Sequence, residues 1–171
     1  MTQYLDVEKK IKSLSHDLHE YIEQRQLDDV LMVGIHTGGV WVAKRLYQSL
    51  ELTSQLAELN ISFYRDDFTR IGMHPQVQPS KLPATVDGRH IILVDDVLYT
   101  GRTIKAALHE IFDYGRPASV ALVVLIDRGG RELPIQADFV GRKVVLEKNQ
   151  QIKLTGPTPL ELSIVDARAD R

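Results

Sequence analysis

The sequence contains no cysteine, which excludes disulfides, thiolate metal sites and a cysteine nucleophile. It has no apolar run long enough to span a membrane, and residues 1–12 lack the uninterrupted apolar stretch of a signal peptide. The formal net charge of −2 shows no excess of basic residues, which a nucleic-acid-binding domain usually has. We therefore expect a cytoplasmic protein without membrane contact, in which any nucleic-acid surface is a local basic face.

Three common nucleotide-binding and hydrolase motifs are also missing: the Walker A loop, the G-x-G-x-x-G fingerprint and the G-x-S-x-G elbow. What remains is an ordinary globular composition, with 43% hydrophobic and 26% charged residues. A chain of 171 residues is long enough for one domain with a proper core. We expect a single domain over residues 1–171.

The most informative segment is residues 91–103, where four apolar residues precede two adjacent carboxylates. The apolar run Ile91–Val94 predicts a buried strand, and Asp95 and Asp96 follow it at the end where open α/β sheets bind ligands. Carboxylates only accept hydrogen bonds, so they suit the hydroxyl donors of a ribose. Successive strand residues face opposite sides, so both acids can serve one ligand only if the strand ends there.

The loop after the two acids has the properties of a phosphate site. Gly101 permits a close backbone approach, and Thr100 and Thr103 add hydroxyl donors. The first N–H groups of the following helix lack internal partners and lie at the positive end of its dipole. Thr103 is expected to cap a helix from Ile104 to Phe112, and Arg102 adds positive charge only if it points inward. The alternative is an ordinary strand-to-helix turn with solvated acids.

The rest of the chain repeats the order of strand, turn and helix, which implies a mostly parallel sheet with helices on both faces. The predicted elements are an amphipathic helix over 7–22, a strand over 30–35, a helix over 40–50, strands over 61–64, 91–94 and 119–126, and short later strands within 139–140 and 143–154. Residues 65–83 lack periodicity, and a loop of this length is usually functional or disordered. His16 and His19 lie one helical turn apart, but no third metal ligand is nearby, so a solvated helix face is favoured.

Four segments together resemble a known family. Residues 91–103 resemble the phosphoribosyl-pyrophosphate (PRPP) motif of type I phosphoribosyltransferases, and residues 33–46 resemble the pyrophosphate loop and its helix. Residues 61–67 resemble the strand that enters the mobile loop, and residues 115–141 complete the likeness. The chain is thus similar to the bifunctional pyrimidine operon attenuator and uracil phosphoribosyltransferase (PyrR) family. This resemblance implies an α/β fold with a mostly parallel twisted sheet, a small hood, and a homo-oligomer (dimer or tetramer).

The implied reaction converts uracil and PRPP to UMP and pyrophosphate, with Mg²⁺ as cofactor. In that reaction Asp95 and Asp96 are the catalytic acids, which hold the ribose hydroxyls directly or through the metal. The 5′-phosphate is assigned to the loop residues Leu98, Tyr99, Thr100, Gly101, Arg102 and Thr103, and the pyrophosphate to His36, Thr37, Gly38 and Gly39. The resemblance places Arg65, Asp66 and Asp67 in the lid over the site.

Asp127 and Arg128 are the expected floor under the base and the pyrophosphate, although an internal salt bridge at a strand end is the alternative. Tyr99 stands where purine enzymes of this type carry an aspartate, which favours a pyrimidine. Two alternatives stay open: an RNA-binding attenuator that responds to UMP and has little enzyme activity, or a phosphoribosyltransferase for another base.

RNA binding, to the leader mRNA of pyrimidine genes, would need a cluster of basic residues on one face. The candidates are Arg131, Arg142 and Lys143. Against them, Gly130 and Gln136 stand where regulatory relatives tend to carry basic residues or histidine. Gly38 also departs from the family, because regulatory members often carry a basic residue there, and the pyrophosphate turn thereby loses one potential phosphate cation. The sequence therefore predicts an enzyme and leaves the RNA role open.

Overall fold

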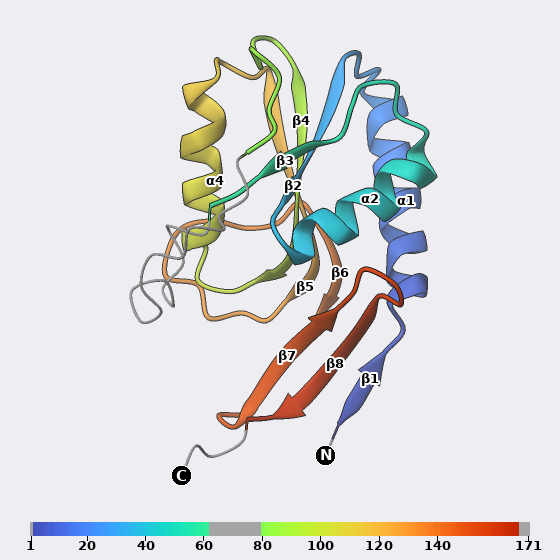
Figure 1. The fold of residues 1–171 in the computed structure, drawn as a ribbon, viewed down its shortest axis with the longest axis vertical. Helices are drawn as coiled ribbons and strands as arrows, with labels where there is room; N and C mark the ends of the chain where they lie inside the picture. The colour runs from blue at the N-terminus through green and yellow to red at the C-terminus, as the bar shows by residue number, and fades with distance from the viewer. Residues whose placement is uncertain (1, 62–79, 168–171) are drawn as a thin grey trace.

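A computed structural model describes residues 2–61 and 80–167 and shows an α/β fold with two sheets (Figure 1). The main sheet contains β2 (Val30–Ile35), β3 (Ala57–Leu59), β4 (His90–Leu98), β5 (Ser119–Asp127) and β6 (Phe139–Lys143). Its strands are all parallel and lie in the order β3-β2-β4-β5-β6. This confirms the predicted mostly parallel sheet.

Three described helices cover the two faces of this sheet: α1 (Val7–Gln24), α2 (Gly38–Leu50) and α4 (Arg102–Asp113). The apolar sides of α1 and α2 pack on one face with Met32, Ile92 and Val94, whereas α4 packs on the other with Leu31 and Ile91. Because both faces are covered, β2 is buried along its whole length, which explains its unbroken apolar sequence. None of the described helices is long and apolar enough to cross a membrane.

A smaller antiparallel sheet contains β1 (Gln3–Leu5), β8 (Glu161–Asp166) and β7 (Gln150–Thr155), in that order. It lies beyond the carboxyl ends of the main strands, where the resemblance places a hood (Figure 1). Its turn reaches α2, because a Cβ added to Gly156 would come within 2.9 Å of the Trp41 ring. Strand β1 was not predicted, since three residues are too short to show a periodic pattern.

Four sequence expectations need correction. Strand β4 does not end before the acids: it continues to Leu98, because it stays paired with β5 as far as Asp127. Helix α4 begins at Arg102 after a left-handed Gly101, so Thr103 is not its cap. The second parallel strand is Ala57–Leu59 rather than residues 61–64, of which 62–64 lie outside the described residues. The short strand expected at 139–140 is part of β6 in the main sheet.

Candidate functional site

Asp95 and Asp96 lie in the second half of β4, toward the carboxyl edge of the main sheet. Asp95 is buried and Asp96 is partly exposed. The Asp95 Oδ1 atom accepts a hydrogen bond of 2.9 Å from the Asp96 backbone N–H, and the Asp96 Oδ1 atom accepts one of 2.9 Å from Val97. These local bonds hold both carboxylates close to the strand backbone.

Both acids lie against the first turn of α2. A Cβ added to Gly39 would come within 2.7 Å of the Val94 carbonyl oxygen and 3.1 Å of the Asp95 carboxylate, and a Cβ on Gly38 would collide with the Asp96 carboxylate. Thr37, the N-cap residue of α2, makes no hydrogen bond from its side chain to the N–H groups of the helix. The positive end of the α2 dipole therefore lies beside the acid-bearing edge, and no side chain caps its first N–H groups.

The structure thus brings together the two sets of residues that the sequence proposed for ribose and pyrophosphate. The acids come from β4, and residues 36–39 link β2 to α2. The peptide bond between His36 and Thr37 is cis. Adjacent strand residues normally face opposite sides, yet the glycines allow the helix to approach so closely that both carboxylates border it.

The predicted phosphate loop between β4 and α4 is held by the connection from β5 to β6. The Thr100 carbonyl accepts hydrogen bonds from the N–H groups of Glu132 (2.9 Å) and Leu133 (3.2 Å). The Arg131 guanidinium donates a bond of 2.7 Å to the Tyr99 carbonyl, and the Thr100 hydroxyl accepts one of 3.2 Å from the Arg102 N–H. The loop conformation is therefore fixed by a second segment of the chain.

The side chains of Tyr99 and Arg102 point outward from this loop, whereas those of Leu98 and Thr100 are buried. The Arg102 guanidinium pairs with Glu132 at 2.9 Å, and its side chain is half exposed, so its charge does not reach inward. The Arg128 guanidinium stacks 4.0 Å above the centre of the half-exposed Tyr99 ring. Such a cation–π contact keeps the Tyr99 ring at the entrance of the loop.

Asp127 forms the internal salt bridge that the sequence left open, with Arg131 as its partner at 2.7 Å. Burial by itself raises the pKa of this carboxyl, but hydrogen bonds from Arg131 and from the Gly129 N–H outweigh it. The positive charges of Arg131 and Lys143 add to them, so the pKa lies below its ordinary value of 3.8. The role of Asp127 and Arg128 beneath a base stays a prediction.

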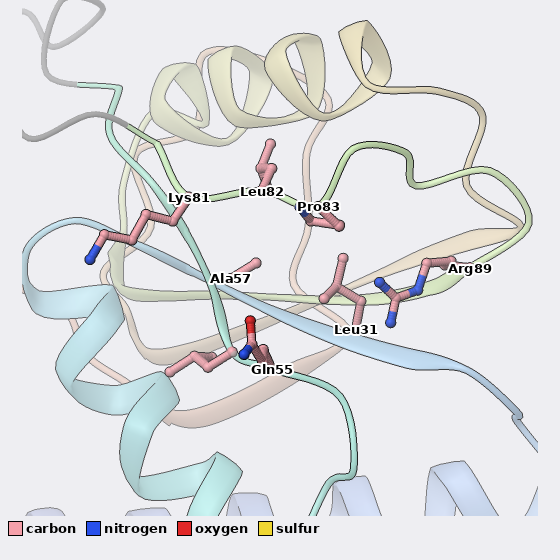
Figure 2. Close-up of a pocket in the computed structure, with 8 residues that line it drawn as sticks. Leu31, Gln55, Ala57, Lys81, Leu82, Pro83 and Arg89 are labelled. Atoms are coloured by element: carbon pink, nitrogen blue, oxygen red, sulfur yellow. The ribbon is translucent and has the colours of Figure 1, made fainter.

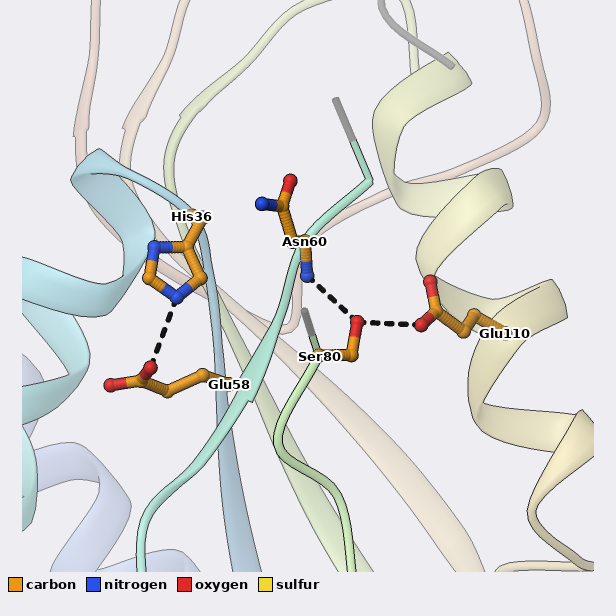
Figure 3. Close-up of polar contacts among 5 residues, drawn as sticks. All are labelled: His36, Glu58, Asn60, Ser80 and Glu110. Carbon is orange, nitrogen blue, oxygen red and sulfur yellow. Dashed lines mark hydrogen bonds and ion pairs between the residues drawn. The ribbon is translucent and has the colours of Figure 1, made fainter. Parts of the chain in front are cut away.

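The sequence reasoning missed Glu58, whose carboxylate is 3.0 Å from Nε2 of His36 (Figure 3). Next to this pair, the Ser80 hydroxyl accepts a hydrogen bond from the Asn60 N–H and donates one to Glu110 of α4. A single glutamate between two apolar residues of a short strand gives no signal of such a contact, because its partner lies 22 positions away in the chain.

Other candidates lie outside the site. Arg65, Asp66 and Asp67 fall outside the described residues. Arg142 and Lys143 are exposed at the end of β6. His16 and His19 pair with glutamates one turn later on the exposed side of α1, which supports the solvated helix face. Within residues 2–61 and 80–167, no three His, Cys, Asp or Glu side chains form a group that could hold a metal by themselves.

A pocket of about 400 Å³ opens at a different place in the fold (Figure 2). Its walls include Leu31 near the start of β2, Ala57 at the start of β3 and Arg89 just before β4. These positions are at the amino ends of the parallel strands. The pocket is therefore separate from the carboxyl edge that carries the two acids.

Comparisons with known proteins identify the family and agree with the fold. The model of the phosphoribosyl transferase domain family matches residues 1–157. The protein of Nitrosococcus oceani named "Bifunctional protein PyrR" is 59% identical over 94% of this chain and 92% of its own length. A Pseudomonas paraeruginosa protein of the same name is 54% identical over 87% of this chain and 88% of its own. The hypoxanthine phosphoribosyltransferase of Trypanosoma cruzi shares the fold, with a TM-score of 0.71 at 18% identity over 95% of this chain and 93% of that one.

Replacing Gly39 with alanine tests the contact between α2 and β4. The new Cβ would press on backbone atoms of Val94 and Asp95, so the helix must move away from the acids. We expect the free energy of unfolding, measured by urea titration, to fall by about 1–3 kcal/mol. The control Ser49→Ala, at an exposed position of α2, should stay within about 0.5 kcal/mol. An unchanged stability of Gly39→Ala would contradict the close approach.

Replacing Asp127 with asparagine tests the ion pair with Arg131. A carboxyl whose pKa is lowered by folding stabilises the fold above its unfolded pKa of about 3.8, and this contribution is lost as the pH falls through the lower folded value. We expect the variant to be about 1–3 kcal/mol less stable than the wild type at pH 7. Urea titrations at several pH values should show this difference shrinking below pH 3.8. A difference independent of pH would contradict the assigned cause.

Proposed function

The chain belongs to the phosphoribosyl transferase domain family and, within it, to the proteins named "Bifunctional protein PyrR", and on this basis we propose that it is a uracil phosphoribosyltransferase. The observation that carries the proposal is the meeting of Asp95 and Asp96 with the first turn of α2. At this place two carboxylates, which accept hydrogen bonds from hydroxyl groups, lie next to the backbone N–H groups at the start of α2, which can donate hydrogen bonds to a phosphate.

In the proposed reaction, N1 of uracil forms a bond to C1 of the ribose of PRPP, and the bond from C1 to the pyrophosphate oxygen breaks. Uracil gives up its N1 proton to water or to the leaving pyrophosphate, and the pyrophosphate leaves with the bonding electrons. Positive charge builds on the ribose ring, and negative charge builds on the leaving group. Catalysis then depends on positioning and on charges fixed in advance, without a covalent enzyme intermediate.

The chain's own residues divide this work between two loops. Asp96, the more exposed acid, is placed to accept from the ribose hydroxyls, while the buried Asp95 borders Gly39 of α2. The N–H groups at the start of α2 receive the pyrophosphate. The loop from Leu98 to Gly101, fixed by its bonds to residues 131–133, receives the 5′-phosphate.

Mg²⁺ fits this donor set. Two adjacent carboxylates offer the hard oxygen ligands that Mg²⁺ prefers, and the ion usually completes its shell with water and substrate phosphates rather than with an all-protein cage. Asp95 and Asp96 are the residues that would hold it. When bound, the ion neutralises charge on the pyrophosphate.

Uracil is proposed as the base for two reasons. The relatives at 54–59% identity carry the PyrR name. The ring of Tyr99, held by Arg128, offers no carboxylate to a purine ring nitrogen. We further propose a single domain and a cytoplasmic location, as expected from the sequence, and a dimer or tetramer, as the resemblance implies.

Replacing both acids, as Asp95→Asn/Asp96→Asn, should lower uracil-dependent pyrophosphate release from PRPP by at least about 100-fold, since charge stabilisation at the ribose is lost. The circular dichroism spectrum should be unchanged, and Asp17→Asn, an exposed acid on α1, should keep full activity. An active double variant would contradict the assigned role. A wild type that turns over a purine and not uracil would overturn the choice of base.

A second candidate function is RNA-binding attenuation of pyrimidine genes in response to UMP. The observation in its favour is the word "Bifunctional" in the names of the relatives. Of the three predicted RNA contacts, Arg142 and Lys143 are exposed, whereas Arg131 is bound to Asp127 and to the Tyr99 carbonyl. An RNA face in this region would therefore depend on the two residues at the end of β6.

A gel shift with the leader RNA of the organism's own pyrimidine genes tests this second function. If the chain is an attenuator, the complex should survive moderate salt, tighten with UMP and weaken about 10-fold or more in Arg142→Gln/Lys143→Gln, because phosphate contacts are lost. The control is Lys12→Gln/Lys44→Gln, at exposed positions of α1 and α2. A shift that is indifferent to UMP and equally weakened by the control would rule the function out.

A further inference from the structure

The turn between β2 and α2 has a single side chain able to carry a positive charge. Between Ile35 and Lys44 the sequence contains no lysine or arginine, and His36 is the one histidine. In the proposed function this turn receives the pyrophosphate, which is a strongly anionic group. If a side-chain cation of the turn itself contributes to holding it, that cation is His36.

The ring of His36 is held by Glu58. The distance from His36 Nε2 to Glu58 Oε2 is 3.0 Å, and the side chains are only 19% and 14% exposed (Figure 3). Burying an ionised carboxylate to this extent costs free energy of folding unless the carboxylate has a hydrogen-bonding or charged partner. In this structure the Glu58 carboxylate pairs with the imidazole ring.

The register of the sheet explains why the two side chains meet. Glu58 of β3 lies opposite Gly34 of β2. A Cβ on Gly34 would come within 2.9 Å of the Val40 Cα atom, so this position faces α2. His36 follows two residues after Gly34, and Glu58 is its diagonal neighbour on the same side of the sheet.

The backbones of both residues are also fixed. The His36 N–H donates a hydrogen bond of 2.8 Å to the Leu59 carbonyl. On its other side, Glu58 exchanges two backbone hydrogen bonds with Lys81, of 3.1 and 2.7 Å. Because backbone hydrogen bonds fix the main chains of His36 and Glu58, the Glu58 carboxylate restricts the orientation of the imidazole ring.

We propose that Glu58 is a positioning residue for the pyrophosphate group of PRPP, and that it acts through His36. The carboxylate holds the imidazole at the entrance of the first turn of α2, where the ring lies beside the row of backbone N–H groups and is the one side chain of the turn able to carry a positive charge. The inference rests on the proposed function, because it needs a pyrophosphate at this turn. It assigns to Glu58 and His36 a task that basic side chains in the turn would otherwise perform.

The test compares single and double variants in steady-state kinetics and in PRPP binding measured by calorimetry. Glu58→Gln keeps the size of the side chain and loses its charge, so we expect the KM and Kd for PRPP to rise about 3- to 10-fold. The kcat and the KM for uracil should stay within about twofold of the wild type, because the base and the ribose contacts are unchanged. His36→Gln should give a rise of similar size.

The double variant Glu58→Gln/His36→Gln decides whether one residue acts through the other. We expect it to bind PRPP no more weakly than His36→Gln alone, since removing the positioning residue has no further effect once the ring is gone. His36→Lys, which places a permanent cation at the same position of the turn, should recover most of the PRPP affinity. The control is Glu110→Gln, another half-buried carboxylate that can still accept from the Ser80 hydroxyl, and it should bind PRPP normally.

Three results would overturn the proposal: unchanged PRPP affinity in Glu58→Gln, additive losses in the double variant, or an equal loss in Glu110→Gln. A fall in kcat with no change in the KM for PRPP would also count against it. If the wild type binds PRPP but does not turn over uracil, the choice of base fails while the calorimetric comparison still tests Glu58. If the wild type does not bind PRPP, both proposals fail together.

Discussion

The close approach of α2 to β4 is the contact on which the candidate site depends. Helices usually stand off a sheet by the thickness of their side chains, but Gly39 brings the first turn of α2 against the backbone of Val94 and Asp95. The positive end of the helix thereby comes to lie beside two carboxylates from another strand. Opposite charges share one edge of the sheet, and a ligand that carries both hydroxyls and phosphates can match both.

The second half of the site is rigid for a different reason. In the loop from Leu98 to Gly101, the carbonyl groups of Tyr99 and Thr100 accept hydrogen bonds from residues 131–133. Arg131 is itself held by the ion pair with Asp127 at the end of β5. Neighbouring parallel strands thus support each other's loops, and groups placed in this way need little reorganisation when a ligand binds.

Sequence patterns predicted the elements whose signal is local. Strand β2 and helix α1 have the predicted apolar patterns, and their bounds match within two residues. The end of β4 could not be predicted, because acids look like a strand end and only the pairing of Leu98 with Asp127 extends it. The contact of Glu58 with His36 depends on sheet register, which no local pattern contains. The acids and the glycine turn were predictable because their chemistry is unusual within short segments.

The charge balance of the site explains how a slightly acidic chain could bind a polyanion. Asp95, Asp96 and Glu58 bring three carboxylates to one edge, while Arg102 and Arg131 are bound to Glu132 and Asp127. Among the described residues, we infer that favourable interactions with PRPP come from the amides of α2, from the imidazole that Glu58 holds and from Arg128, and a bound metal ion would add to them. Binding of this kind is local and directional. It needs no basic surface, whereas RNA binding at the same protein would need one. The net charge of −2 is therefore compatible with the proposed enzyme. The proposed attenuator would in addition need basic residues concentrated on one face.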